Sequence, residues 1–134
     1  MIKVMAFGSF DIFHKGHEYY LSKAKSLGDE LTVVVSRDQN IIKMKNKEPL
    51  NNQENRLLRV YEFEAVDKAI LGNKKDMFQV IVDEKPAVIC LGYDQWANED
   101  NLIKELFSRG ISGIKIVRID SFEPETYKSS KLKK

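Results

Sequence analysis

Two histidines three positions apart are the side chains of this sequence best suited to chemistry. His14 and His17 lie in the segment GSFDIFHKGH, residues 8–17. Side chains three apart on a helix lie on the same face, and an imidazole near neutral pH donates hydrogen bonds or carries positive charge. We therefore expect this pair to bind phosphate oxygens and to stabilise a negatively charged transition state.

The elements on either side place the two histidines at a junction between a strand and a helix. Residues 4–7 are an apolar run that predicts a buried strand, and apolar residues at three- and four-residue spacing over 19–27 predict a helix. Open α/β sheets bind ligands at such junctions, outside the carboxyl ends of their strands. The N–H groups at a helix start also attract phosphate, so residues 8–17 are expected to form a phosphate site.

Two other interpretations of the histidine pair stay open. In the first, both are surface residues without a ligand. In the second, they bind zinc, which takes three or four protein ligands. The sequence has two histidines in all, and its one cysteine, Cys90, lies within an apolar strand pattern. The Gly-Ser-Phe-Asp sequence before the first histidine favours the phosphate site, with no metal ligands of its own, over both alternatives.

Five apolar runs alternate with amphipathic segments along the chain. Short, near-continuous apolar runs are typical of strands in a sheet that is covered on both faces. Residues 37–50 lack this pattern and are expected to form a surface loop with at most one short helix. The expected strands are residues 3–8, 30–36, 68–71, 87–91 and 114–119, and the expected helices are residues 15–27, 53–64, 76–85 and 99–109.

This alternation of strands and helices defines a fold class. Successive β-α-β units give a parallel sheet with right-handed crossovers and helices on both faces. No internal repeat or low-complexity linker divides the chain. We therefore predict a single, doubly wound α/β domain over residues 1–134, with a five-stranded parallel sheet.

Composition narrows the class of partners. A chain of 134 residues suits one domain with one core. The formal net charge of +2 is too small to indicate nucleic acid binding, and no apolar run reaches the roughly 18 residues of a membrane span. A single cysteine and the absence of a signal-peptide pattern favour the cytoplasm.

The segment 8–17 resembles the signature G-[ST]-F-D-x-x-H-x-G-H of the cytidylyltransferase-like nucleotidyltransferases. The similarity extends over most of the chain, which is close in length and layout to the glycerol-3-phosphate cytidylyltransferases and the archaeal FAD synthetases. It implies a Rossmann-like fold and a reaction in which a substrate phosphate attacks the α-phosphorus of a nucleoside triphosphate. The fixed positions of the signature are matched by Gly8, Ser9, Phe10, Asp11, His14, Gly16 and His17.

The resemblance implies roles for residues in and after this segment. His14 and His17 contact the triphosphate, and Asp11 fixes the turn in part. The resemblance implies further nucleotide contacts from Gly8, Ser9, Phe10, Lys15 and Gly16. Lys15 occupies a variable position of the signature, and the alternative for it is a solvated surface lysine.

Two lysines and an arginine match a second feature of the glycerol-phosphate enzymes. Lys45 and Lys47 lie 11 and 9 residues before Arg56. The resemblance implies that both lysines hold phosphates, that Lys47 takes part in catalysis, and that Arg56 contacts the phosphorylated substrate. The alternative for these residues is a solvated basic loop and a surface arginine on a helix.

Two later segments complete the expected site. Asp94 follows the fourth strand and would bind the ribose or the base of the nucleotide, with Trp96 packed nearby. Ser129 and Ser130 fall where the family has a serine- or threonine-rich phosphate segment. A helix cap without a ligand is the alternative for this serine pair.

The resemblance also ranks the substrates. Pantetheine-phosphate adenylyltransferases have threonine where His14 stands, so they rank low. Residues 69–72, 91–95 and 129–130 are most similar to archaeal FAD synthetases, whereas Trp96 and the lysine pair resemble the cytidylyltransferases. We predict that ATP and FMN give FAD and pyrophosphate. The alternatives are CTP and glycerol 3-phosphate giving CDP-glycerol, and a non-catalytic nucleotide sensor. Mg²⁺ is expected to arrive with the triphosphate, and the resemblance implies a homodimer.

Overall fold

A five-stranded parallel sheet is the centre of the computed structural model, which describes residues 1–73, 76–92 and 98–120. The strand order is β3-β2-β1-β4-β5. Each strand begins within one residue of its predicted start, which confirms the predicted sheet. The strands are β1 (Lys3–Gly8), β2 (Glu30–Val35), β3 (Lys68–Leu71), β4 (Val88–Gly92) and β5 (Lys115–Ile119).

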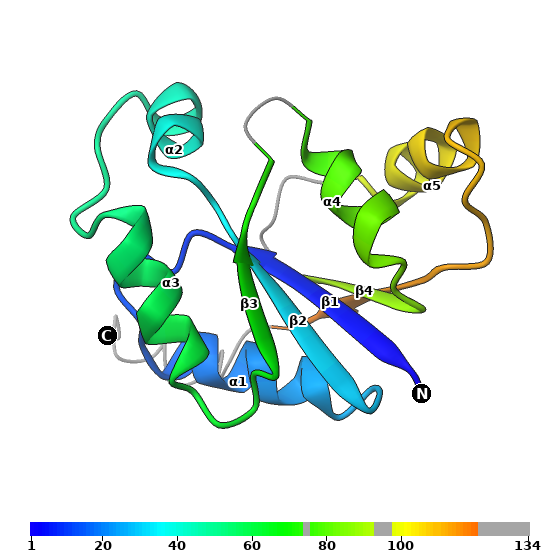
Figure 1. The fold of residues 1–134 in the computed structure, drawn as a ribbon, viewed down its shortest axis with the longest axis horizontal. Coiled ribbons are helices and arrows are strands. Elements are labelled where there is room, and N and C mark those ends of the chain that lie inside the picture. Colours follow the sequence, from blue (N-terminus) through cyan, green and yellow to red (C-terminus); the bar gives the residue numbers. More distant parts are fainter. Residues whose placement is uncertain (74–75, 93–97, 121–134) are drawn as a thin grey trace.

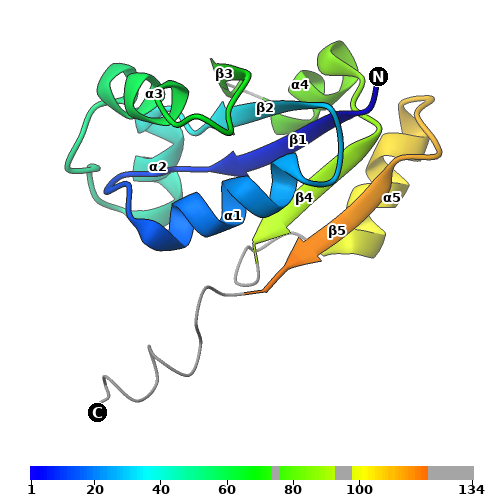
Figure 2. The same cartoon turned by 90° about the horizontal axis from the view of Figure 1, so that it is seen from below.

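Helices cover both faces of this sheet, as predicted (Figure 1). One face of the sheet packs against α1 and α3, and the other packs against α4 and α5. Figure 2 shows the same layers from below, with β4 and β5 extending beyond α1. No helix in the described ranges is long and apolar enough to cross a membrane. The helices are α1 (Lys15–Lys25), α2 (Asp38–Lys45), α3 (Gln53–Tyr61), α4 (Met77–Glu84) and α5 (Glu99–Ser108).

Two predicted helices end at least two residues earlier in the structure, and the second of them is α3, which ends at Tyr61 where residue 64 was predicted. The first helix ends at Lys25, two residues earlier than predicted. Gly28 is needed for a different reason: a Cβ there would lie 2.6 Å from Val4 Cγ2 and 2.8 Å from the Ile2 carbonyl oxygen. The turn therefore passes too close to the start of β1 for any side chain. Residues 37–50, expected to be mainly loop, contain the two-turn helix α2.

The sheet has its switch point between β1 and β4. Strand β1 pairs with β2 over six positions but with β4 over three, the last being Ala6 with Cys90. The buried hydroxyl of Tyr20 on α1 lies where these strands separate. It donates to the Cys90 carbonyl oxygen at 2.9 Å and accepts the Phe7 N–H at 3.3 Å. Burial raises the pKa of Tyr20, so this hydroxyl stays protonated beneath the carboxyl ends of the strands.

Candidate active site at the carboxyl end of β1

The two histidines together form the cap of α1. His14 is the N-cap residue, and its Nδ1 accepts the N–H of Gly16 at 3.0 Å. His17 Nδ1 accepts the N–H of His14 at 3.3 Å. This reciprocal arrangement is a capping box. The usual capping box has Ser or Thr at the N-cap and Glu or Gln at the third helical position. The rings are stacked with their centroids 4.0 Å apart, so the structure brings the predicted pair together.

The capping bonds fix which ring nitrogen can carry a proton. A nitrogen that accepts an N–H is unprotonated, so each neutral imidazole holds its proton on Nε2. The cap also uses N–H groups that we expected to bind phosphate: Gly16 donates to His14 Nδ1, and the His17 N–H donates to the His14 carbonyl oxygen at 2.9 Å. Of the nitrogens of the two neutral rings, Nε2 is therefore the one that can donate to an anion.

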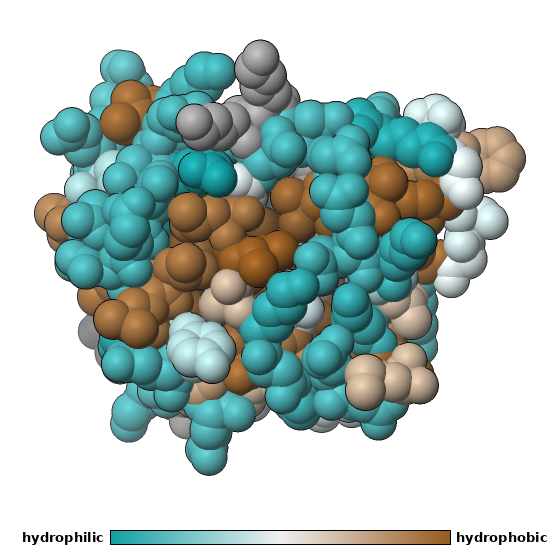
Figure 3. Space-filling view, viewed as in Figure 1, coloured by the Kyte–Doolittle hydropathy of each residue, from teal (hydrophilic) through white to brown (hydrophobic). Residues whose placement is uncertain are grey.

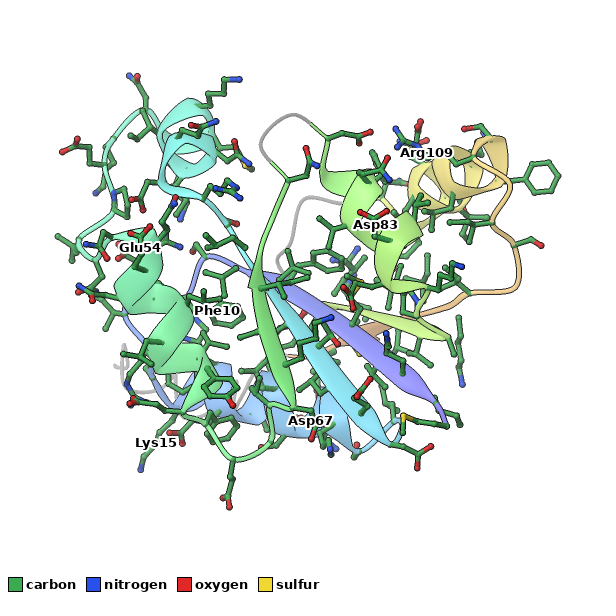
Figure 4. The ribbon with its side chains drawn as sticks, in the orientation of Figure 1. Phe10, Lys15, Glu54, Asp67, Asp83 and Arg109 are labelled. Carbon is green, nitrogen blue, oxygen red and sulfur yellow. The ribbon has the colours of Figure 1, made fainter. Side chains whose placement is uncertain are left out.

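Phe10 supports the histidines from the protein interior. Its backbone has φ 53°, in the left-handed region, and its side chain is 3% exposed. The ring lies against Gly8, where a Cβ would be 2.7 Å from Phe10 Cζ, and it meets the His17 ring edge to face at 5.1 Å. Figure 4 shows Phe10 between α3 and the sheet, with Lys15 directed away from the sheet. The Phe10 ring therefore supports His17 from inside the protein, and the nucleotide contact of Phe10 stays a prediction.

Arg56 is also inside the protein, although we expected it to contact the substrate. Its side chain is fully buried. Nη1 donates to the carbonyl oxygens of Ser9 at 2.8 Å and Ser36 at 2.7 Å, and Nη2 donates to Asp38 Oδ1 at 2.6 Å. Nε donates to the Asn51 carbonyl oxygen at 2.9 Å. Arg56 therefore joins the carboxyl ends of β1 and β2 to the start of α3.

The Asp11 carboxylate connects the turn before α1 to the residues just before α3. Oδ2 accepts the Leu50 N–H and Oδ1 accepts the Asn51 N–H, both at 2.8 Å. The Asn51 side-chain amide also donates to the Asp11 carbonyl oxygen. Burial of the carboxyl raises the pKa of Asp11, but the two N–H donors and the Arg56 charge outweigh burial and hold the pKa below its usual range. Asp11 is consequently ionised at neutral pH.

The predicted lysines lie on the segment that Asp11 and Arg56 connect to the strands. We call residues 45–51 the lysine segment, since Lys45 ends α2 and Lys47 follows it. Both lysines are exposed, as is Lys15, and neither Lys45 nor Lys47 has an ion-pair partner among the described residues. Lys47 lies three residues before Leu50, whose N–H donates to Asp11. Asp11 belongs to the turn of residues 9–14 between β1 and α1, which we call the histidine turn.

Three predicted site residues lie outside the described ranges: Asp94, Ser129 and Ser130. The last described residues before them in the sequence are Gly92, whose carbonyl oxygen accepts from Arg118 Nη1 at 2.8 Å, and Asp120, which accepts from the Tyr19 hydroxyl at 2.7 Å. Within the part of the chain that the structure describes, no group of three or more His, Cys, Asp or Glu side chains could hold a metal ion.

A family model, curated relatives and a solved structure each match most of this chain. Residues 5–134 match the family model described as cytidylyltransferase-like. The FAD synthase of Thermoplasma volcanium is 43% identical over 134 residues, which cover 100% of this chain and 93% of the relative. The FAD synthase of Methanosarcina mazei is 47% identical over 119 residues, 89% and 77% of the two chains. The crystal structure of a lipopolysaccharide core biosynthesis protein from Thermoplasma volcanium has a TM-score of 0.87 and 45% identity, covering 92% of this chain and 99% of that one.

Proposed function

Because the chain belongs to the cytidylyltransferase-like family, we propose that it is an FMN adenylyltransferase, which transfers AMP from ATP to FMN and releases pyrophosphate. The observation that carries this proposal is the histidine capping box, which has its Nε2–H groups at the carboxyl end of the central strand. The FAD synthases among its relatives support ATP and FMN as the substrates.

The proposed reaction needs alignment and charge neutralisation more than a strong base. An FMN phosphate oxygen attacks the α-phosphorus of ATP, and the bond from that phosphorus to the bridging oxygen of pyrophosphate breaks. The nucleophile is already an anion, so no side chain has to remove a proton. His14 and His17 donate from Nε2 to the phosphate oxygens as negative charge develops. Lys45 and Lys47 neutralise the phosphates, and Lys47 acts on the leaving pyrophosphate.

Three further site residues are proposed from the family resemblance. Asp94 contacts the ribose or base, and Ser129 and Ser130 contact phosphates. The side chains that we propose to bind the phosphates are imidazole and ammonium groups, which suit phosphate oxygens and are not magnesium ligands. Magnesium would accordingly be held by the triphosphate, where it offsets the charge of the leaving group. A buried free thiol, Cys90, and these substrates suit the cytoplasm.

Exposed apolar side chains beside the histidine turn favour FMN over glycerol 3-phosphate. Ile12 follows Asp11 directly, and Leu50 is bound to Asp11 through its N–H. Their exposed fractions are 58% and 77%. Apolar surface next to a polar site suits a flat aromatic ring with a phosphate, whereas glycerol would leave it uncovered. This observation supports the adenylyltransferase proposal over the cytidylyltransferase alternative.

A panel of substrates tests the proposal. ATP or CTP is mixed with FMN or glycerol 3-phosphate in the presence of Mg²⁺, and pyrophosphate release is measured. We expect turnover with ATP and FMN, its loss on adding EDTA, and recovery with excess Mg²⁺. Turnover with CTP and glycerol 3-phosphate alone would establish the alternative. ATP binding without release under any condition would indicate a sensor, and activity that depends on bound zinc would contradict the proposed role of magnesium.

The proposed enzyme is a homodimer, and a hydrophobic surface supports this. Figure 3 shows a hydrophobic band across the middle of the face on which α3 and β3 lie. β3 is the edge strand of the sheet, and Leu58 and Tyr61 on α3 are 57% and 58% exposed. Contiguous apolar surface of this kind marks an interaction site.

Sedimentation velocity tests this assembly. We expect a dimer for the wild-type protein and a monomer for Leu58→Asp, because a buried unpaired carboxylate destabilises an apolar interface. Phe107→Asp is the matched control, since Phe107 is 71% exposed on α5, on the opposite face of the sheet. A wild-type monomer, or equal effects of the two variants, would argue against an interface at α3 and β3.

A further inference from the structure

The lysine segment has separate connections to two parts of the site. Arg56 binds its Asn51 carbonyl oxygen and also binds Asp38 at the start of α2. Asp11 binds its Leu50 and Asn51 N–H groups. Arg56 reaches the start of this turn through the Ser9 carbonyl oxygen, whereas Asp11 bonds to the lysine segment directly from a position three residues before His14.

The geometry suits a carboxylate in particular. The two oxygens of Asp11 each accept one backbone N–H, at equal distances of 2.8 Å, from consecutive residues. An ionised carboxylate has two acceptor oxygens, whereas an asparagine side chain has one oxygen and one NH₂ donor. Hydrogen bonds to an ionised acceptor are also roughly twice as strong as neutral ones. In Asp11→Asn, the side-chain NH₂ would thus face one of the two backbone N–H groups, so one hydrogen bond would be replaced by repulsion between two donors.

We propose that Asp11 is a positioning residue for nucleotidyl transfer, which holds the lysine segment against the histidine turn so that Lys47 and the histidines act on the same triphosphate. This inference rests on the proposed function for its reaction. The carboxylate itself touches no reacting atom. It acts by fixing the chain three residues after Lys47 to the chain three residues before His14. Without the carboxylate, Arg56 and the Asn51 side chain would still join the two segments, but the direct bonds to the Leu50 and Asn51 N–H groups would be lost.

The experiment is a double-mutant cycle between Asp11→Asn and Lys47→Ala. Misplacing a charged group by about 1 Å costs up to about a hundredfold in rate, so Asp11→Asn is expected to lower kcat/KM for ATP about ten- to a hundredfold. In the Lys47→Ala background the same change should cause little further loss, because the group that Asp11 positions is gone. Coupling of this kind is the signature of two residues that act as a unit.

A matched control separates positioning from general stability. The Asp29 carboxylate accepts the Ile2 N–H at 2.7 Å, away from the carboxyl ends of the strands. Asp29→Asn makes the same chemical change there and should leave kcat/KM unchanged. Amide hydrogen exchange should speed up at Leu50 and Asn51 in Asp11→Asn, while urea unfolding of the two Asn variants should show that both remain folded at assay conditions.

Two results would overturn the inference. The first is additive losses in the cycle, which would mean that Asp11 does not act through Lys47. The second is unchanged exchange at Leu50 and Asn51. If the wild-type protein turns over no substrate pair, the proposed function fails instead. The cycle is then measured on the dissociation constant for ATP with Mg²⁺, where Asp11→Asn must still weaken binding in a Lys47-dependent way for the positioning role to stand.

Discussion

Replacing His17 by alanine is expected to lower kcat about 10²–10³-fold, the usual cost of removing one preorganised donor to a charged transition state. The variant loses the Nε2–H group and also the Nδ1 acceptor for the His14 N–H. Loss of a capping side chain costs about 1 kcal/mol, which a stable domain tolerates. Steady-state pyrophosphate release measures the rate, and thermal unfolding by circular dichroism measures the smaller stability change.

His17→Asn distinguishes the two roles of this histidine. The asparagine side chain places its oxygen near the position of Nδ1, so the variant can still accept the His14 N–H and keep the cap. It has nothing at the position of Nε2. If the donor at Nε2 carries catalysis, His17→Asn should be as slow as His17→Ala while unfolding like the wild type. Near-normal turnover in His17→Asn would show that the histidine serves only the helix start.

The second large effect is expected at Arg56, in stability. Arg56→Met removes four hydrogen bonds and leaves the carbonyl oxygens of Ser9, Ser36 and Asn51 and the Asp38 carboxylate without this donor. Asp38 is 34% exposed and can be solvated after the change, so the loss comes mainly from the carbonyl oxygens, at about 1–3 kcal/mol for each buried acceptor left unpaired. We expect the urea midpoint of unfolding to fall accordingly.

Arg59 provides the control for this measurement. It lies one turn further along α3, is exposed, and stacks over the Phe13 ring with its Cζ 4.9 Å from the centroid. An exposed cation–π contact contributes about 0.5–1 kcal/mol, so Arg59→Met should shift the midpoint only slightly. Arg56→Lys should recover part of the loss, since an ammonium cannot reproduce the planar fork of donors. Equal midpoints for Arg56→Met and Arg59→Met would contradict the structural role of Arg56.

The strands were predictable because their burial leaves a continuous apolar pattern in the sequence. β2 and β4 are covered on both faces, so residues 31–35 and 88–91 are apolar with few exceptions. The end of α1 was less predictable, since Gly28 is typical of a helix stop while its real constraint is a close approach to β1. That approach joins residues about 24 positions apart, and no local pattern encodes it.

The candidate site was predictable in its histidines but not in the residues that hold them. His14 and His17 stand out because their types and spacing are specific. The sequence around Arg56, by contrast, is that of an ordinary surface arginine on a helix. Its side chain is buried because β1, β2 and α3 meet around it. The direction of the Phe10 ring follows from a positive φ that the sequence does not reveal. The pairing of Asp11 with Leu50 and Asn51 likewise depends on two segments 40 residues apart.

The unequal pairing of β1 has a consequence for the dynamics of the protein. Six paired positions join β1 to β2, whereas three join it to β4, and segments with fewer hydrogen bonds open locally at lower free energy. The histidine turn and the lysine segment are hydrogen-bonded to each other and to the ends of β1 and β2. We expect β4 to open from β1, near Tyr20, more readily than β2 does. A nucleotide bound across this junction would restrict that motion, and the amides of β4 would exchange more slowly even where the ligand does not touch them.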